Sequence, residues 1–597
     1  MSSPINNLMT TIRSYYGSAS NINAQQNVAK GGPDLGPVRL ATRTIDHSGQ
    51  KGTSLPDSIE KQSLALMLTQ PEHLQASKEN LRDLSFTVFE NAINTIGKLP
   101  YPTKIKDALE NKLTTEFKNL GSKLGNGGIA TKLDIKHCKA FSKHLTNTII
   151  HTIREHVGAK AFKNDKIETL IKNELRIGFA SELGKKETLW EPLTKEIKLH
   201  SQGGKSNNYV STMRPAYDLA ALRGNYQQNG IYGVSSMATQ ETRHAVNLWT
   251  TEFKGTDVEF HGVRHGVNMP FGEKDPEKQI QGADRRTYEV ITAAADVKRE
   301  AILEHIAKHG KDEPFPLTIV SSSLLTPTQG LKYKKYEIGQ QQAWQRATQK
   351  SNSGELKINV PDEYGNLNEV TLKLDVLPFS FGVNGLAKLK SSAPIALKIL
   401  NKLPKVDVSG WKWADKHNAP LFNQLLEKAK EISAQDQTGK YTRVQSYIDQ
   451  IQHVIDRGMH HKDEGNAYAL PVLVSLLSNE LGAVPAWNCM SGKDRTGYLD
   501  AKIKETLVSQ HQRGENEIIN QFEKMSDERS RVLEKIIFES GSLEIQKACT
   551  GVAGYKVNEG KVKIMGVKKD LSVQSNRNNL LPHAAALLEG LSGAVKA

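Results

Sequence analysis

One segment near the C-terminal end constrains the fold of this chain more than any other. Ala483–Glu505 contains a short apolar run that ends at Cys489, then five residues, then Arg495 and an amphipathic stretch. Apolar residues in that stretch recur every four positions and stop near Gly514, as expected for a helix packed on one face. The order strand, loop, helix predicts an α/β domain with Cys489 and Arg495 at the two ends of the loop.

The residue types of this loop suit the transfer of a phosphoryl group. A cysteine at a helix N-terminus is stabilised as a thiolate, which is the nucleophilic form. Successive amides of a short loop can point inward and bind an anion, and Gly492 permits the tight turn. Arg495 offers a planar pair of donors to two phosphate oxygens. The segment therefore predicts Cys489 as nucleophile and Arg495 as the phosphate-binding arginine.

Other residues in and near the loop are candidates for supporting roles. Thr496 is placed to hydrogen-bond the cysteine sulfur when the phosphocysteine is hydrolysed. Asp494 is the nearest general acid for the leaving alkoxide, and Lys493 is placed to bind a second phosphate. Asp463, upstream of the cysteine where many such enzymes have a mobile acid, is the alternative general acid. The remaining candidates for substrate binding in the loop are Met490, Ser491 and Gly492.

A second motif leaves another hypothesis open. Arg264-His265-Gly266 matches a motif of histidine phosphatases, in which histidine is the nucleophile. Acid phosphatases of that class have arginine near the position of Asn268. Either His265 is the nucleophile, or Arg264 and His265 are basic residues that line the pocket of Cys489.

Composition narrows the class of partner and the chemistry. The net charge of 79 − 65 = +14 favours anionic partners such as phosphorylated molecules or acidic membrane surfaces. The three cysteines form no C-x-x-C pair, so we expect reduced thiols, no zinc site and no cofactor. Adjacent His460 and His461 would point to different faces of a helix, so no metal is predicted there either. No run of eighteen apolar residues and no N-terminal apolar region occur, so neither a membrane span nor a cleaved signal is expected.

At 597 residues the chain is too long for one core. We expect a disordered segment over 1–55, a helical domain over 56–195, a catalytic α/β domain over 196–575 and a loose tail over 576–597. A linker-like composition at Ser201–Asn208 supports the division. The predicted fold is therefore a helical N-terminal domain followed by an α/β domain that resembles the cysteine phosphatases.

Periodicity predicts several elements of these domains. Two of the expected helices open with Asp284 and Asn418, which suit N-caps. The predicted strands are Leu317–Leu324, Leu356–Val360 and Glu369–Val376, and the predicted helices include Leu109–Leu124, Leu133–Val157, Asp284–His309, Asn418–Ala434 and Ala469–Leu481.

The loop and several other segments resemble one known family. CMSGKDRTG at 489–497 is similar to the loop of the SopB/SigD and IpgD effector phosphatases, which type III secretion systems deliver into host cells. FSFGVNGL at Phe379–Leu386 resembles their other signature. Further similar segments are Phe260–Pro276, His244–Trp249, His460–Asp463, Ser542–Lys547 and Thr550–Val557.

This resemblance implies an activity and partners. It implies removal of phosphate, chiefly at the inositol 4-position, from phosphoinositides and soluble inositol polyphosphates, and action in the host cytosol and at its membranes after type III secretion. It also implies a Rho-family small GTPase and a secretion chaperone as candidate partners of the N-terminal region. An alternative is a binding module for a GTPase and lipid whose catalysis is secondary. Two positions depart from the family pattern: Met490 replaces a lysine, and Gly385 replaces a glutamate.

Overall fold

The computed structural model describes most of the chain between residues 78 and 570. The described ranges are 78–99, 101–125, 132–164, 167–168, 171, 175, 191–200, 206–229, 247–270, 275–325, 332–383, 411–433, 439–457, 467–514, 519–523, 525–550, 561–564 and 567–570. The expected segments over 1–55 and 576–597, as well as Asp463 and Gly385, lie outside these ranges.

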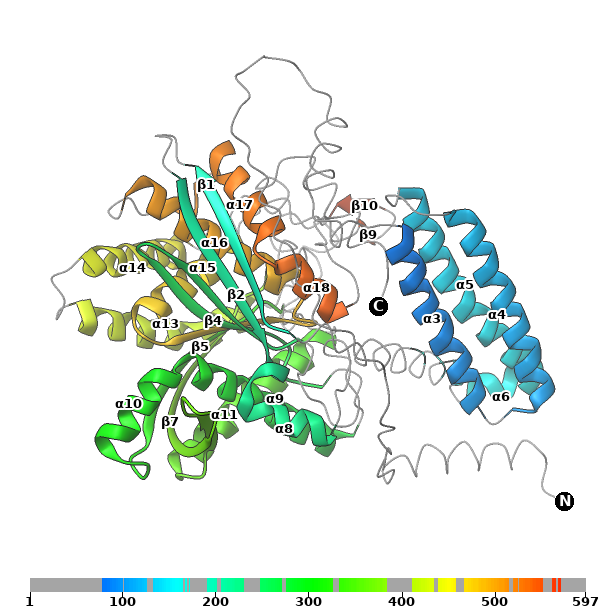
Figure 1. The fold of residues 1–597 in the computed structure, drawn as a ribbon, viewed down its shortest axis with the longest axis horizontal. Coiled ribbons are helices and arrows are strands. Elements are labelled where there is room, and N and C mark those ends of the chain that lie inside the picture. The colour runs from blue at the N-terminus through cyan, green and yellow to red at the C-terminus, as the bar shows by residue number, and fades with distance from the viewer. Residues whose placement is uncertain are drawn as a thin grey trace, which may run out of the picture.

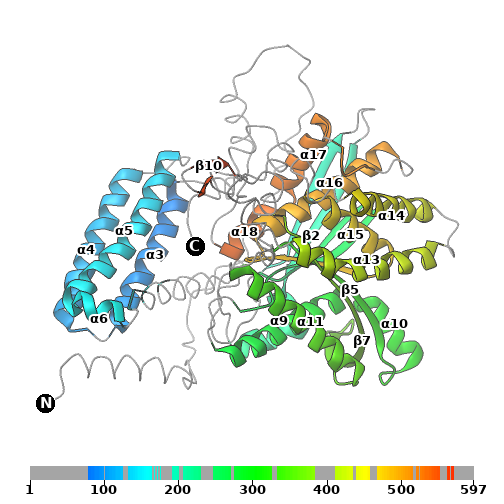
Figure 2. The ribbon, with the colours of Figure 1, turned by 180° about the vertical axis from the view of Figure 1, so that it is seen from behind.

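A helical bundle forms the N-terminal part and lies apart from the rest in both views (Figures 1 and 2). Leucines of α4, and Leu145, Ile149 and Ile153 of α5, repeat at helical spacing and are buried in one cluster with residues of α3, which gives the bundle its own core. Helices α4 and α5 cover the two ranges predicted from that spacing. The bundle contains α3 (Lys78–Lys98), α4 (Thr103–Leu124), α5 (Lys132–Val157) and α6 (Ala159–Asn164).

The second part is built on a mixed sheet with the strand order β1-β2-β3-β4-β8-β5-β7-β6. Strands β4, β8, β5 and β7 are parallel, and antiparallel strands extend the sheet on both sides. The strands are β1 (Leu193–His200), β2 (Ser206–Pro215), β3 (Trp249–Gly255), β4 (Val258–Gly266), β5 (Phe315–Ser323), β6 (Lys357–Pro361), β7 (Leu367–Ser380) and β8 (Val484–Cys489). A separate hairpin joins β9 (Lys561–Ile564) to β10 (Val567–Asp570).

Helices cover both faces of this sheet, so the central strands are buried on each side (Figure 1). One face carries α8 (Ala220–Asn229), α9 (Pro276–Val297), α10 (Arg299–His309) and α11 (Lys332–Asn352). The other face carries α13 (Trp411–Ser433), α14 (Gly439–Arg457), α15 (Ala469–Glu480), α16 (Asp494–Arg513), α17 (Asp527–Glu539) and α18 (Ser542–Thr550). None of the described helices is long and apolar enough to cross a bilayer.

The structure corrects two expectations about the elements. Strand β1 begins at Leu193 and pairs with β2, which includes Ser206–Asn208, so the linker-like residues belong in part to an edge hairpin. The polar composition of these residues fits a hairpin at the edge of a sheet, where outer side chains face water. The predicted helix Asp284–His309 is two helices that meet at Lys298.

Both proposed N-caps were wrong. Asp275 caps α9, where its carboxylate accepts from two backbone amides and Pro276 occupies the first turn. Helix α13 begins at Trp411, so Asn418 lies inside it. The Asn418 side chain instead forms two hydrogen bonds, of 2.9 and 2.8 Å, with the backbone of Ser380.

Candidate active site

The Cys489–Arg495 loop lies at the centre of the sheet. Strand β8 is flanked by β4 and β5 and is parallel to both, with Cys489 opposite Gly266. The chain leaves β4 through α9 and α10 on one face, and it reaches β8 from α13 to α15 on the other. In open α/β sheets, ligands bind at such a switch point, beyond the carboxyl ends of the strands.

Cys489 and the first turn of α16 are held together by two hydrogen bonds. The Cys489 amide donates to the Thr496 hydroxyl oxygen at 2.8 Å, and the Trp487 indole donates to the Thr496 carbonyl at 3.1 Å. Cys489 itself is only 2% exposed. Thr496 accepts through its oxygen in the first bond, so its own proton stays available for the sulfur. The structure thus places Thr496 beside Cys489, as the sequence predicts.

Gly492 makes the tight loop possible. Its φ is +69°, a conformation that disfavours other residues. A Cβ at this position would lie 3.0 Å from the Gly266 nitrogen and 3.1 Å from the Asn247 oxygen. The loop is therefore packed directly on the backbone at the end of β4, and Val267 N–H also donates to the Met490 carbonyl at 3.2 Å. Ser491, the neighbouring loop residue, is partly exposed.

Arg495 lies over the end of β5. Its Nη1 donates to the carbonyl oxygen of Leu324 at 2.7 Å, and Leu324 N–H donates to the Asn488 carbonyl at 2.8 Å. Asn488 directly precedes Cys489, so the arginine and the cysteine are tied to the same pair of strand ends. A guanidinium has five N–H donors, so one bond to a carbonyl is compatible with binding phosphate.

Lys493 and Asp494 form an ion pair with each other. The Lys493 Nζ lies 2.7 Å from the Asp494 Oδ1, and Lys493 is 5% exposed. The Asp494 carboxylate thus already has a lysine partner in the loop.

Met490 has a packing role in this chain. Its side chain contacts an apolar cluster that contains Val267 and Leu325, together with residues of α9 and α11. The position where the resembled family has lysine is thus occupied by a side chain that contacts this apolar cluster.

Arg264 and His265 point to opposite faces of β4, as successive residues of a strand must. Arg264 Nη1 lies 3.4 Å from the Asp500 Oδ2 of α16 and is buried. His265 is buried on the α9 side, where it interacts electrostatically with Arg286. The two side chains therefore do not line one pocket together, and they cannot bind one phosphate as a histidine phosphatase requires.

The burial of the His265 imidazole leads us to expect that the stability of the protein depends on pH. Burial lowers the pKa of its imidazole to about 4, with Arg286 adding to the shift. The unfolded chain, with a pKa near 6.5, then binds the proton more readily between about pH 6.5 and 4, so the free energy of unfolding falls as pH drops through that window. The total loss is on the order of 3 kcal/mol.

His265→Asn keeps a donor for the Gly266 carbonyl, which lies 2.7 Å from the histidine Nδ1. We expect the variant to be less stable than wild type at pH 7.5 and the difference to shrink towards pH 4.5. Urea unfolding followed by tryptophan fluorescence at both pH values measures this. A difference that stays constant with pH would contradict the assignment.

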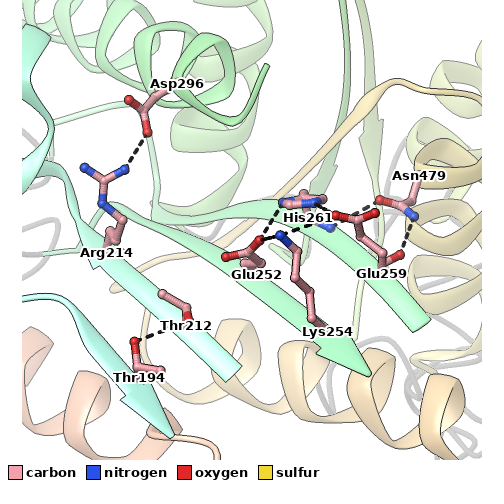
Figure 3. Close-up of polar contacts among 9 residues, drawn as sticks. All are labelled: Thr194, Thr212, Arg214, Glu252, Lys254, Glu259, His261, Asp296 and Asn479. Atoms are coloured by element: carbon pink, nitrogen blue, oxygen red, sulfur yellow. Dashed lines mark hydrogen bonds and ion pairs between the residues drawn. The ribbon is translucent and has the colours of Figure 1, made fainter. Parts of the chain in front are cut away.

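A cluster of Glu252, Glu259 and His261 on the β3–β4 hairpin has donor atoms within 4.8 Å of one another (Figure 3). Lys254 forms ion pairs with both carboxylates, and His261 Nε2 lies 2.9 Å from Glu259 Oε1. The carboxylates are thus balanced by side chains of the hairpin itself, and we assign this cluster no ligand.

Sequence reasoning missed three contributors to the loop. The Asn247 carbonyl accepts from the Gly266 N–H and lies against Gly492, the Leu324 carbonyl accepts from Arg495, and the Trp487 indole donates to the Thr496 carbonyl. The segment around Asn247 was noted for its family likeness, but nothing in it indicated contact with Gly492. Every residue has a backbone carbonyl, so residue types do not indicate which carbonyl will accept such a bond.

The fold and the loop together define an α/β phosphatase. The family model described as "Enterobacterial virulence protein IpgD" matches residues 65–574, which is most of the chain. The chain therefore belongs to the IpgD family, and it is a phosphatase.

Two relatives in sequence agree with this assignment, and one solved structure aligns with most of the chain. The inositol phosphate phosphatase IpgD of Shigella flexneri is 31% identical over 446 residues, covering 71% of this chain and 76% of that protein. The inositol phosphate phosphatase SopB of Salmonella typhimurium is 31% identical over 450 residues, covering 72% and 73% respectively. The crystal structure of a Legionella phosphoinositide phosphatase, SidF, aligns with a TM-score of 0.47 at 14% identity, covering 85% of this chain and 91% of that one.

Proposed function

We propose that this phosphatase removes phosphate from phosphorylated inositol rings, both phosphoinositides and soluble inositol polyphosphates, chiefly at the 4-position and through a phosphocysteine. The observation that carries the proposal is the position of Cys489 and Arg495 at the two ends of one loop, beyond the carboxyl end of the central strand. The names of the relatives, inositol phosphate phosphatases, support the substrate class.

In the first step the Cys489 thiolate attacks phosphorus and the bond to the ring oxygen breaks. The N-terminus of α16, which begins at Asp494, favours both the thiolate and the bound phosphate. Arg495 stabilises the negative charge that develops on the equatorial oxygens. Its bond to Leu324 holds the guanidinium at the loop before substrate arrives.

The leaving ring oxygen needs a proton, which we assign to Asp494. In the free enzyme Asp494 is paired with Lys493. A substrate phosphate that binds Lys493 would release the carboxyl group and allow it to carry a proton. Binding and acid catalysis would then be coupled through one ion pair. Asp463 stays the alternative acid.

In the second step, water attacks the phosphocysteine and the thiolate leaves. Asp494, now ionised, can accept the proton of that water. Thr496 can donate a hydrogen bond from its hydroxyl to the departing thiolate, because its oxygen already accepts from the Cys489 amide. Phosphate and the free thiolate are thereby restored.

The remaining parts of the proposal concern location and partners. Membership of a virulence protein family supports secretion into a host cell by a type III system. The net charge of +14 favours docking on an anionic host membrane. We assign a Rho-family GTPase and a secretion chaperone to the N-terminal region as candidate partners.

The substrate assignment is tested by resolving the product isomers. Purified full-length protein is incubated with a panel of singly and multiply phosphorylated phosphoinositides and with inositol polyphosphates, and products are separated by ion-exchange chromatography. We expect loss of the 4-phosphate from most substrates that carry one. Loss of phosphate mainly from the 3- or 5-position would contradict the positional assignment, and binding without phosphate release would favour the binding-module alternative.

A further inference from the structure

A buried polar cluster lies behind the catalytic loop, on the opposite face of the sheet from Cys489. It joins Ser323 at the end of β5, Asn488 at the end of β8, and Glu337 and Gln340 on α11. All four side chains are buried. None of the four lies in the loop between Cys489 and Arg495, and none has a role in the reaction steps proposed above.

The hydrogen bonds of the cluster converge on the Ser323 hydroxyl. Ser323 Oγ donates to Glu337 Oε2 at 2.5 Å and accepts from Gln340 Nε2 at 2.8 Å. Gln340 Nε2 also contacts Glu337 Oε2 at 2.7 Å, and Asn488 Nδ2 donates to Gln340 Oε1 at 3.1 Å. Glu337 thereby accepts the hydrogen bond of the Ser323 hydroxyl, so the oxygen lone pairs of Ser323 face other donors.

One of those lone pairs faces the main chain. Leu325 N–H donates to Ser323 Oγ in a long bond of 3.4 Å, so the N–H of the Leu324–Leu325 peptide faces Ser323. A peptide unit is planar, and its N–H and C=O point in opposite directions. When the Leu325 N–H faces Ser323, the Leu324 carbonyl must face the other way. That carbonyl is the acceptor of Arg495 Nη1 at 2.7 Å.

A segment noted in the sequence also takes part. FSFGVNGL begins with the last two residues of β7, and the next residue, Phe381, donates its N–H to the Ser323 carbonyl at 2.7 Å. Burial raises the pKa of the Glu337 carboxyl, while hydrogen bonds from Ser323 and Gln341 oppose that shift. The first residues of FSFGVNGL therefore contact the cluster at the end of β7.

We propose that Ser323, oriented by Glu337 and Gln340, is a positioning residue for catalysis: it aims the Leu324 carbonyl at Arg495 and so holds the guanidinium in place for the transition state. The inference rests on the proposed role of Arg495. Ser323 would then affect turnover although its side chain lies on the opposite face of the sheet from Cys489.

The test is a double-mutant cycle with a matched control. Ser323→Ala removes the hydroxyl with little change in volume, and it is made in the wild-type enzyme and in the Arg495→Lys enzyme. Ser322→Ala is the control: Ser322 is equally buried on the same strand, and its hydroxyl has no hydrogen-bond partner among the described residues. Release of phosphate from an inositol phosphate gives kcat and KM for each protein at a temperature well below its Tm.

We expect Ser323→Ala to lower kcat about tenfold with little change in KM, because Arg495 acts mainly in the transition state. In the Arg495→Lys background the same change should cost less than about twofold, since the group that Ser323 positions is already gone. Ser322→Ala should leave kcat within about twofold of wild type. Inhibition by vanadate, a mimic of the transferring phosphoryl group, should weaken with Ser323→Ala in parallel with kcat.

An equal loss of kcat from Ser323→Ala in both backgrounds would overturn the inference, as would a lower Tm with unchanged kcat. If Ser323→Ala does not fold, Glu337→Gln replaces it in the cycle and must show the same non-additivity. Failure of the proposed function is recognised separately, because Arg495→Lys alone would then leave turnover unaffected.

Discussion

Cys489→Ser is expected to abolish phosphate release, with a loss of at least about 10⁴-fold in kcat/KM. A serine hydroxyl is not ionised at neutral pH, and the N-terminus of α16 cannot ionise it. The donor of the hydrogen bond from residue 489 to the Thr496 hydroxyl is the backbone amide, which the substitution keeps, so the loop should keep its shape. Initial rates with an inositol polyphosphate substrate measure the effect.

Cys549→Ser is the matched control for this experiment. Cys549 is as buried as Cys489 and lies on α18, and burial raises the pKa of its thiol to about 12, so it stays protonated and unreactive at neutral pH. We expect Cys549→Ser to keep turnover within about threefold of wild type, even with some loss of stability. If the two variants released phosphate equally well, Cys489 would not be the nucleophile.

Arg495→Lys is expected to lower kcat by about 10³-fold. Lysine keeps the positive charge but loses the planar pair of donors that matches two phosphate oxygens. It also loses the rigid geometry of the 2.7 Å bond to the Leu324 carbonyl. Because the guanidinium stabilises charge that exists only in the transition state, KM should change much less than kcat.

Arg513→Lys, at the exposed end of α16, is the control for this substitution. It exchanges the same residue types on the same helix, far from the loop, and should leave kcat unchanged. Steady-state kinetics over the same substrate range apply to both variants. A rise in KM with unchanged kcat in Arg495→Lys would show that the arginine binds substrate without acting in the transition state.

The parts of this protein that sequence predicted well are those that local pattern determines. Strand β8, the loop and α16 follow one another within thirty residues, and their apolar spacing and Gly492 are visible without any tertiary contact. Helices α5 and α15 match their predicted ranges for the same reason, and α4 contains its predicted range but begins at Thr103.

The contacts that could not be predicted from the sequence are made between segments that meet only in the folded chain. Strand order brings β4 beside β8 although more than two hundred residues separate them, and only then does Asn247 contact Gly492. The ion pair between Lys493 and Asp494 likewise depends on side-chain positions in the loop. No sequence pattern indicates either contact.

Two errors had a signal that was overlooked. Strand alternation alone separates Arg264 from His265, once FHGVRHG is recognised as the strand β4. The pair Asp275-Pro276 is a strong helix start, because proline is favoured in the first turn and aspartate as its cap. Asp284, nine residues further on, is inside that helix and forms an ion pair with Arg346.

The central claim is that the phosphoryl group passes through the sulfur of Cys489, and trapping the covalent intermediate tests this most directly. Wild-type protein is mixed with substrate, quenched within milliseconds in alkaline denaturant, which preserves both phosphocysteine and phosphohistidine, and mapped by peptide mass spectrometry. We predict one phosphoryl group on the peptide that contains Cys489, and none in Cys489→Ser. Label on the peptide that contains His265, or turnover without any phosphorylated peptide, would contradict the account.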